Sequence, residues 1–176
     1  MMRQRTTKRV TLPTGSENHL YTLDVFIISG PIAQSFVKKN KVISRTIQIR
    51  GDQTLEELHQ AIFAAFDREE EHMYEFQIGG KGPMDPEARR YVLSMYDHEM
   101  GHEGRQAGAV DQTTIGSLGL KVNEAFGYWF DFGDDWWHQI DVIAIEEKAG
   151  RGKYPKVIKR VGKSPPQYAD WDEEEE

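Results

Sequence analysis

The stretch that decides the fold runs from residue 126 to residue 142 and reads Phe126-Gly127-Tyr128-Trp129-Phe130-Asp131-Phe132-Gly133-Asp134-Asp135-Trp136-Trp137-His138-Gln139-Ile140-Asp141-Val142. Its even-numbered positions are aromatic before Gly133 and mostly apolar after it, whereas Gln139 and Asp141 are polar. This alternation predicts two strands that bury their even-numbered residues. A three-residue loop centred on Gly133 would place Phe130 opposite Trp136, Tyr128 opposite His138 and Phe126 opposite Ile140.

The chain before this hairpin predicts three strands and one main helix. Strands are expected at 20–28, 42–50 and 73–78, where β-branched and aromatic residues are frequent. Between the last two, Thr54 and Glu57 have the spacing of a capping box, and an apolar stripe follows at helical spacing. A short helix is expected to begin at Thr113 or Thr114. We therefore predict an α+β fold with a β-grasp-like sheet (strand–strand–helix–strand, then the C-terminal hairpin) and one main helix packed on one face.

Charge divides the 176-residue chain into three parts. Residues 1–17 form a basic N-terminal tail, residues 18–147 a single α+β domain, and residues 148–176 an extended C-terminal segment that is first basic and then acidic. The net charge is −7, but residues 10–147 alone hold 11 basic and 23 acidic residues, which gives −12. A domain of this charge repels duplex phosphate, so only the basic flanks could attract nucleic acid.

Composition excludes several classes of protein. The chain has no cysteine, which removes disulfides, thiolate metal sites and cysteine nucleophiles and fits a reducing cytoplasm. No apolar run approaches the roughly 18 residues of a spanning helix, and the basic N-terminus lacks the apolar stretch of a secretory signal. We expect a cytoplasmic protein without a membrane contact.

The hairpin sequence resembles the hallmark of the plasmid pRiA4b ORF-3-like family, with Phe130-Asp131-Phe132-Gly133-Asp134-Asp135-Trp136 followed by His138 and Ile140. The resemblance extends to His59 in the helix motif and to the stretch 72–78, but Ser44 stands where the family has tryptophan before Arg45. It implies the fold and a loose link to mobile-element or DNA-transaction proteins. It implies no reaction.

One motif suggests an enzyme. In His98-Glu99-Met100-Gly101-His102 the two histidines would lie one helical turn apart and could hold zinc, with Glu99 as general base. Glu124 could supply a third ligand, and Asp85-Pro86 would begin the helix. The glycines that follow weaken any helix here. A zinc-dependent hydrolase is therefore the alternative hypothesis, and a solvated acidic loop is the simpler interpretation.

The acidic and histidine side chains of the hairpin turn form a second constellation that could bind a metal or transfer protons. The favoured interpretation is structural, because aspartates beside Gly133 bind turn amides and a histidine on an aromatic face is usually a bonded core residue. The residues of the family motif assigned this structural role are His59, His72, Asp131, Gly133, Asp134, Trp136 and His138.

Trp129 and Trp137 occupy odd-numbered positions and are therefore expected on the outer side of the hairpin, where residues 150–168, a partner or a stacked base could cover them. The leading hypothesis is a non-catalytic interaction module without a cofactor, bound to an unidentified protein partner. The residues assigned to this possible interaction surface are Trp129, Trp137, Arg151, Lys153, Lys156, Lys159 and Arg160.

Overall fold

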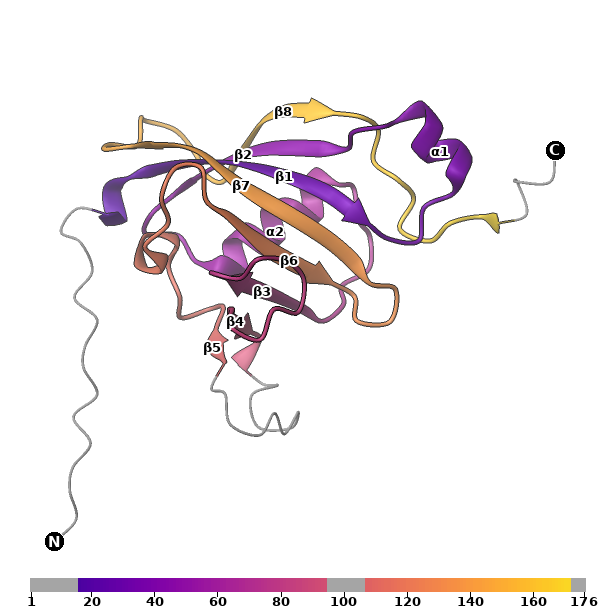
Figure 1. Cartoon of the computed structure of the whole chain (residues 1–176). Helices are drawn as coiled ribbons and strands as arrows, with labels where there is room; N and C mark the ends of the chain where they lie inside the picture. Colours follow the sequence, from indigo (N-terminus) through magenta and orange to yellow (C-terminus); the bar gives the residue numbers. More distant parts are fainter. Residues whose placement is uncertain (1–15, 95–106, 172–176) are drawn as a thin grey trace, which may run out of the picture.

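The computed structural model describes residues 16–94 and 107–171, which form an eight-stranded mixed sheet in the order β5-β4-β3-β6-β7-β1-β2-β8 (Figure 1). All neighbours are antiparallel except β4 and β5. The strands are β1 (Leu20–Ser29), β2 (Ser44–Arg50), β3 (Tyr74–Ile78), β4 (Arg89–Val92), β5 (Gly108–Ala109), β6 (Ala125–Phe130), β7 (Trp136–Glu146) and β8 (Lys156–Val161).

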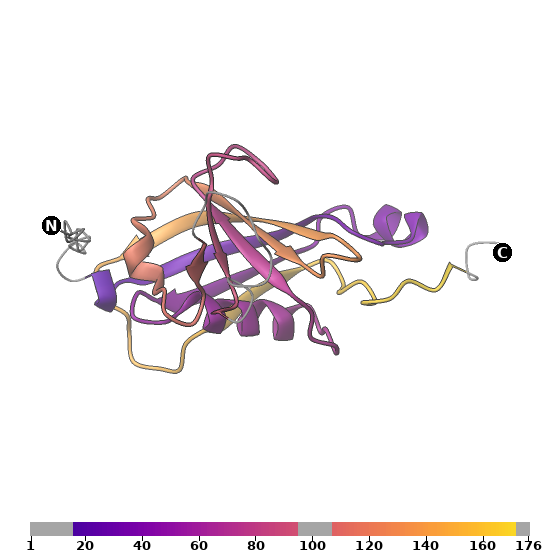
Figure 2. The same ribbon diagram turned by 90° about the horizontal axis from the view of Figure 1, so that it is seen from below.

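The main helix, α2 (Leu55–Ala65), covers one face of the sheet (Figure 2). Its start is the predicted capping box, in which Glu57 N donates to Thr54 Oγ1 and Thr54 N donates to the Glu57 carboxylate. A second, unpredicted helix, α1 (Gln34–Lys39), follows β1, and 3-10 turns lie at Ser16–Asn18 and Ile115–Leu118. The latter turn follows Thr114, as predicted. In the described part of the chain, no helix has the length and apolar character needed to cross a membrane.

The predicted hairpin register is confirmed. Phe130 pairs with Trp136, Tyr128 with His138 and Phe126 with Ile140, and the side chains of all six residues are buried. These side chains point toward α2 and join the apolar residues of β1 and β2 in one core. The alternation of the sequence was sufficient to fix the register because a slip by one residue would have exposed the whole aromatic set.

The loop of the hairpin differs from the prediction. It contains five residues, 131–135, and the left-handed positions are Asp131 (φ 60°) and Asp135 (φ 57°) rather than Gly133. Aspartate tolerates this conformation because its short polar side chain can bond locally. Phe132, expected in the core, is only half-buried and contacts the ring of Trp129 on the outer side. The aspartates, not the glycine, therefore shape the turn.

The α+β class and the single main helix are confirmed, but the β-grasp description is not. The strand expected to complete that motif, β3, lies on the far side of the hairpin and pairs with β4 and β6. The helix expected to begin at Asp85 is also wrong. Asp85 instead accepts hydrogen bonds from Lys81 N and Glu87 N in a turn, and β4 follows.

Residues beyond 147 contribute to the same sheet, because β8 pairs with β2 at its edge. After β8, the chain runs beside the connection between α2 and β3. There Gln167 accepts hydrogen bonds from Glu69 N and Glu70 N, and Tyr168 contacts His72. The C-terminal segment therefore packs along this connection instead of forming the expected cover over Trp129 and Trp137.

Candidate functional site

A group of bonded polar side chains, here called the histidine cluster, comprises the buried His59, Arg68, Tyr128 and His138 and the exposed Glu71. The Tyr128 hydroxyl donates to His59 Nδ1 at 2.6 Å, and His59 Nε2 donates to the Glu71 carboxylate at 2.9 Å. Burial lowers the pKa of His59 and outweighs the opposing effect of Glu71. Burial also raises the pKa of Tyr128 well above its usual range. Both groups are therefore neutral at pH 7.

His138 is held as a neutral ring in the same cluster. Its Nε2 lies 2.8 Å from Arg68 Nη2, and its Nδ1 lies 3.1 Å from the Tyr128 carbonyl oxygen. Since arginine can only donate, Nε2 accepts and Nδ1 carries the proton. Burial and the adjacent Arg68 charge lower the pKa of His138 well below its usual range. The hairpin histidine is thus 1% exposed and fully engaged.

Arg68 is the member of this cluster that sequence reasoning missed. Its guanidinium lies over the rings of Phe66, Phe130 and Trp136 at 5.3, 4.8 and 5.0 Å, and burial lowers its pKa to about 10. It remains charged at pH 7. The available signal was a lone arginine inside the acidic run that follows α2, where a cation also complements the helix dipole.

The predicted constellation of turn carboxylates and His138 does not come together. Asp131 Oδ1 accepts from Gly133 N and Asp134 N, and its other oxygen lies 3.4 Å from His72 Nε2. Asp135 instead accepts from Trp129 Nε1 on the outer face, and His138 points into the core. The carboxylates and the histidine therefore have separate partners.

The zinc motif His98, Glu99 and His102 lies outside the described residues. Its expected third ligand, Glu124, is exposed just before β6 and accepts a hydrogen bond from Lys121 N. Within residues 16–94 and 107–171, no three His, Asp or Glu side chains are grouped so that they could hold a metal ion. The zinc hypothesis remains a prediction from the sequence.

The outer face of the sheet, opposite α2, carries a stack of three aromatic rings. The ring centroids of Trp129 and Trp137 lie 4.8 Å apart, and the two ring planes are nearly parallel, with an angle of 9° between them. The ring centroid of Phe132 lies 4.1 Å from that of Trp129. Both tryptophans are half-buried, as expected for odd-numbered positions of the hairpin. No helix of the described residues covers this face, and the loop between β3 and β4 passes over part of it (Figure 2).

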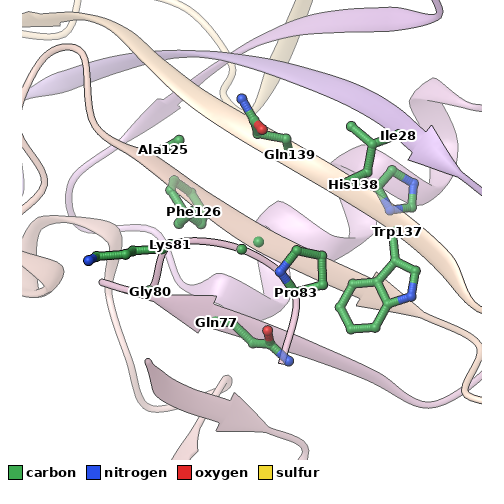
Figure 3. Close-up of a pocket in the computed structure, with 12 residues that line it drawn as sticks. Ile28, Gln77, Gly80, Lys81, Pro83, Ala125, Phe126, Trp137, His138 and Gln139 are labelled. Carbon is green, nitrogen blue, oxygen red and sulfur yellow. The ribbon is translucent and has the colours of Figure 1, made fainter. Parts of the chain in front are cut away.

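A small pocket opens beside this stack, where that loop passes over β6 (Figure 3). Gly127 of β6 is among its lining residues, Trp137 and Pro83 stand at its sides, and Gln139 and Ile28 continue it across the sheet. Its volume is about 70 Å³. Pockets for small-molecule ligands usually have roughly 300–1,000 Å³. This pocket, here called the sheet pocket, therefore matches one side chain better than a cofactor.

The basic residues assigned to the C-terminal segment lie at the edge of the sheet. Lys156 and Lys159 are exposed on β8, and Arg151 and Lys153 are exposed in the loop before it. Arg160 differs, because it donates to the Ala65 carbonyl at the end of α2. Arg45 donates to the same carbonyl and to the Val161 and Gly162 carbonyls, so it fastens β8 to the domain.

Fold and core motif together define a class of α+β proteins in which an aromatic hairpin lies at the centre of a mixed sheet and packs a histidine–arginine cluster under one helix. The chain belongs to the plasmid pRiA4b ORF-3-like family, whose sequence model matches residues 35–170. The predicted resemblance is thereby confirmed.

A solved structure supports the fold. The crystal structure of a protein of unknown function, MM3350 from Methanosarcina mazei Go1, matches with a TM-score of 0.61 and 22% sequence identity over 84% of this chain and 72% of that chain. At this identity the match shows the fold alone. Comparison with curated proteins gives no match.

Proposed function

We propose that this chain is a non-catalytic interaction module that binds a protein partner through the outer face of its sheet. The observation that carries the proposal is the sheet pocket beside the Trp129–Trp137 stack, on a face that no described helix covers. Tryptophans next to a pocket that fits one side chain are typical of the energetic centre of a protein interface. The sheet pocket by itself, at about 70 Å³, matches the size of one side chain of a partner.

The histidine cluster supports a structural role for the family motif. The Tyr128 hydroxyl, the His59 imidazole and the Glu71 carboxylate form a hydrogen-bonded series that resembles a nucleophile with its base. However, Tyr128 is 0% exposed and its hydroxyl already donates to His59. A substrate could reach this oxygen only if the aromatic core opened. The cluster serves better as a bonded scaffold that holds α2 against the hairpin.

Membership of the family supports a proposal for the class of the partner protein. It is named after an open reading frame of a plasmid, and this favours a partner among mobile-element or DNA-transaction proteins. The charge of −12 over residues 10–147 favours contact with such proteins over direct contact with duplex. Nucleic acid remains a secondary possibility through the exposed lysines of β8.

Selection of a phage-displayed library of random 12-residue peptides on the full chain tests the proposal. Selected peptides should lose at least tenfold in affinity for Gly127→Val, which adds a branched side chain to the lining of the sheet pocket. Cβ at this position meets nothing closer than 3.7 Å, so the variant should fold. Thr22→Val, on the outer face of β1 away from the pocket, is the matched control. Peptides that bind Gly127→Val as tightly as the control would refute the proposal, as would a selection without enrichment.

The alternative hypothesis of a zinc hydrolase has an independent test. Elemental analysis of the untagged, chelator-free protein should show stoichiometric zinc that is lost on His98→Ala or His102→Ala. Protein without metal would remove that alternative and leave the interaction module.

A further inference from the structure

The sheet pocket continues into a second hollow on the same face. This hollow has a volume of about 310 Å³ and shares Ile28 and Gln139 with the sheet pocket. Its walls include Phe26 and Val42, and both Val42 and Ile28 are about half exposed, at 50% and 49%. Together the two hollows form an apolar groove that begins at the aromatic stack and crosses β7 and β1. Isolated exposed aliphatic residues are ordinary, but a connected row beside tryptophans indicates a binding surface.

Two carboxylates lie side by side at this groove. Asp141, which lines the second hollow, is directly opposite Asp24 in the pairing of β7 with β1. Each uses one oxygen locally, since Gln139 Nε2 donates to Asp141 Oδ1 and Thr46 Oγ1 donates to Asp24 Oδ1. Like charges at directly opposed positions of a sheet repel each other. The arrangement is therefore unfavourable unless something positive is added.

The chain does not supply that positive charge from its described part. Within residues 16–94 and 107–171, neither Asp24 nor Asp141 forms an ion pair, although Arg50 and Arg90 do so elsewhere. Lys41 borders the second hollow but lies beyond ion-pair distance of Asp141. The groove thus combines apolar walls with two carboxylates that have no ion-pair partner among the described residues, in a domain whose overall charge attracts cations.

We propose that the partner presents an extended segment in which an aliphatic or aromatic side chain enters the sheet pocket over Gly127 and a nearby lysine or arginine lies between Asp24 and Asp141. This inference rests on the proposed function and specifies the chemistry of the partner. Asp141 is one strand repeat, roughly 7 Å, from Gln139 at the pocket. The basic residue is therefore expected two or three positions from the apolar one, since alternate residues of an extended segment have the same spacing.

The peptides selected on the full chain test this chemistry. Enriched sequences should combine a lysine or arginine with an aliphatic or aromatic residue at that spacing. Their affinity should fall at least tenfold for the double variant Asp24→Asn/Asp141→Asn and should weaken as salt increases. The matched control is Glu56→Gln/Glu69→Gln, which removes the same charge on the α2 side. Thermal melting of both double variants verifies that they fold.

The outcomes separate the two proposals. Peptides that lose affinity for Gly127→Val but bind Asp24→Asn/Asp141→Asn and its control equally would overturn the basic partner and leave the interaction module intact. Peptides indifferent to both changes would overturn both proposals. The chain's own basic residues Arg3, Arg5, Lys8 and Arg9 and a second copy of the chain are the other possible occupants of the groove. Tighter peptide binding after neutralisation of those four residues would show that the chain's own basic residues occupy the groove. Dimerisation that Asp24→Asn/Asp141→Asn abolishes would show that a second copy occupies it. Either result would overturn the proposal that a separate partner binds there.

Discussion

Trp136 and Trp137 are neighbours in the chain and lie on opposite faces of β7. Trp136 is fully buried, with Arg68 over its ring and Gly30 so close that a Cβ there would come within 2.5 Å of it. Trp137 is half-buried, stacks on Trp129 and borders an open pocket. The polar groups differ in the same way, because His138 has both ring nitrogens bonded in the core, while Asp141 on the outer face has no ion pair with any residue that the structure describes.

This difference separates the residues that identify the family from those that we propose to bind a partner. The recognisable motif residues are mostly engaged with one another, so their interactions maintain the scaffold. Side chains with remaining binding capacity lie on the outer face, where sequence patterns are weaker. A search for function that begins with the hallmark motif therefore leads to the core rather than to the outer face of the sheet.

The largest expected effect comes from the adjacent tryptophans. Trp136→Ala should lower the free energy of unfolding by about 3–5 kcal/mol, because it removes a fully buried ring and leaves a cavity. Trp137→Ala should lower it by about 1 kcal/mol, the range of one aromatic pair, and should weaken the selected peptides. Urea denaturation of both variants measures the contrast. Equal losses of stability would show that the two faces are not distinct.

His138→Ala sharpens the same contrast with a polar residue. We expect a loss of about 1–3 kcal/mol in the free energy of unfolding, because Arg68 Nη2 and the Tyr128 carbonyl oxygen lose their partner inside the core. Gln139→Ala, the exposed neighbour, should change stability by less than about 0.5 kcal/mol. Unchanged melting of His138→Ala would mean that the ring is accessible and available for function.

The buried histidines also predict a dependence on pH. The pKa values of His59 and His138 are lowered from 6.5 by burial, so the unfolded chain binds protons more readily than the native one. Their contribution to stability is complete above pH 6.5, and it is lost as pH falls from 6.5 toward the pKa of each folded group. Denaturation curves between about pH 8 and pH 5 should show a shallower decline for His138→Gln than for the unaltered chain. Parallel declines would indicate that His138 is protonated in the native state.

The sequence was most informative where one regular spacing of apolar residues determined which side chains are buried. The hairpin register, the capping box at Thr54 and three of the strands followed from local patterns that the tertiary structure did not override. The strand order could not be predicted, because no local signal tells β3 to pair with β6 rather than with β1. The predicted three-residue loop centred on Gly133 was wrong, because the loop spans residues 131–135 and its left-handed conformations lie at Asp131 and Asp135.

The site could be predicted only in part. The outward direction of Trp129 and Trp137 followed from alternation, but the sheet pocket did not. Its walls come from the loop after β3 and from the four strands β1, β3, β6 and β7, of which only β6 and β7 are neighbours in sequence. Arg68 was hidden in an acidic run, and the pairing of Asp24 with Asp141 required the register of β1 against β7. Contacts of this kind depend on topology and have no local signature.

The smallest expected effect concerns nucleic acid at the β8 edge. At low salt the full chain should bind duplex DNA weakly, and binding should disappear toward physiological salt because the domain is acidic. Lys156→Gln/Lys159→Gln should lower the slope of log affinity against log salt by about 1–2 without a change in melting, since both side chains are exposed. An unchanged slope would show that β8 is not the contact with DNA.

Deletion of residues 148–163 is not an equivalent test, because it removes a strand that pairs with β2 and supplies two carbonyl acceptors for Arg45. A loss of binding after that deletion would report damage to the sheet as readily as the loss of a phosphate contact, so the comparison depends on changing charge alone.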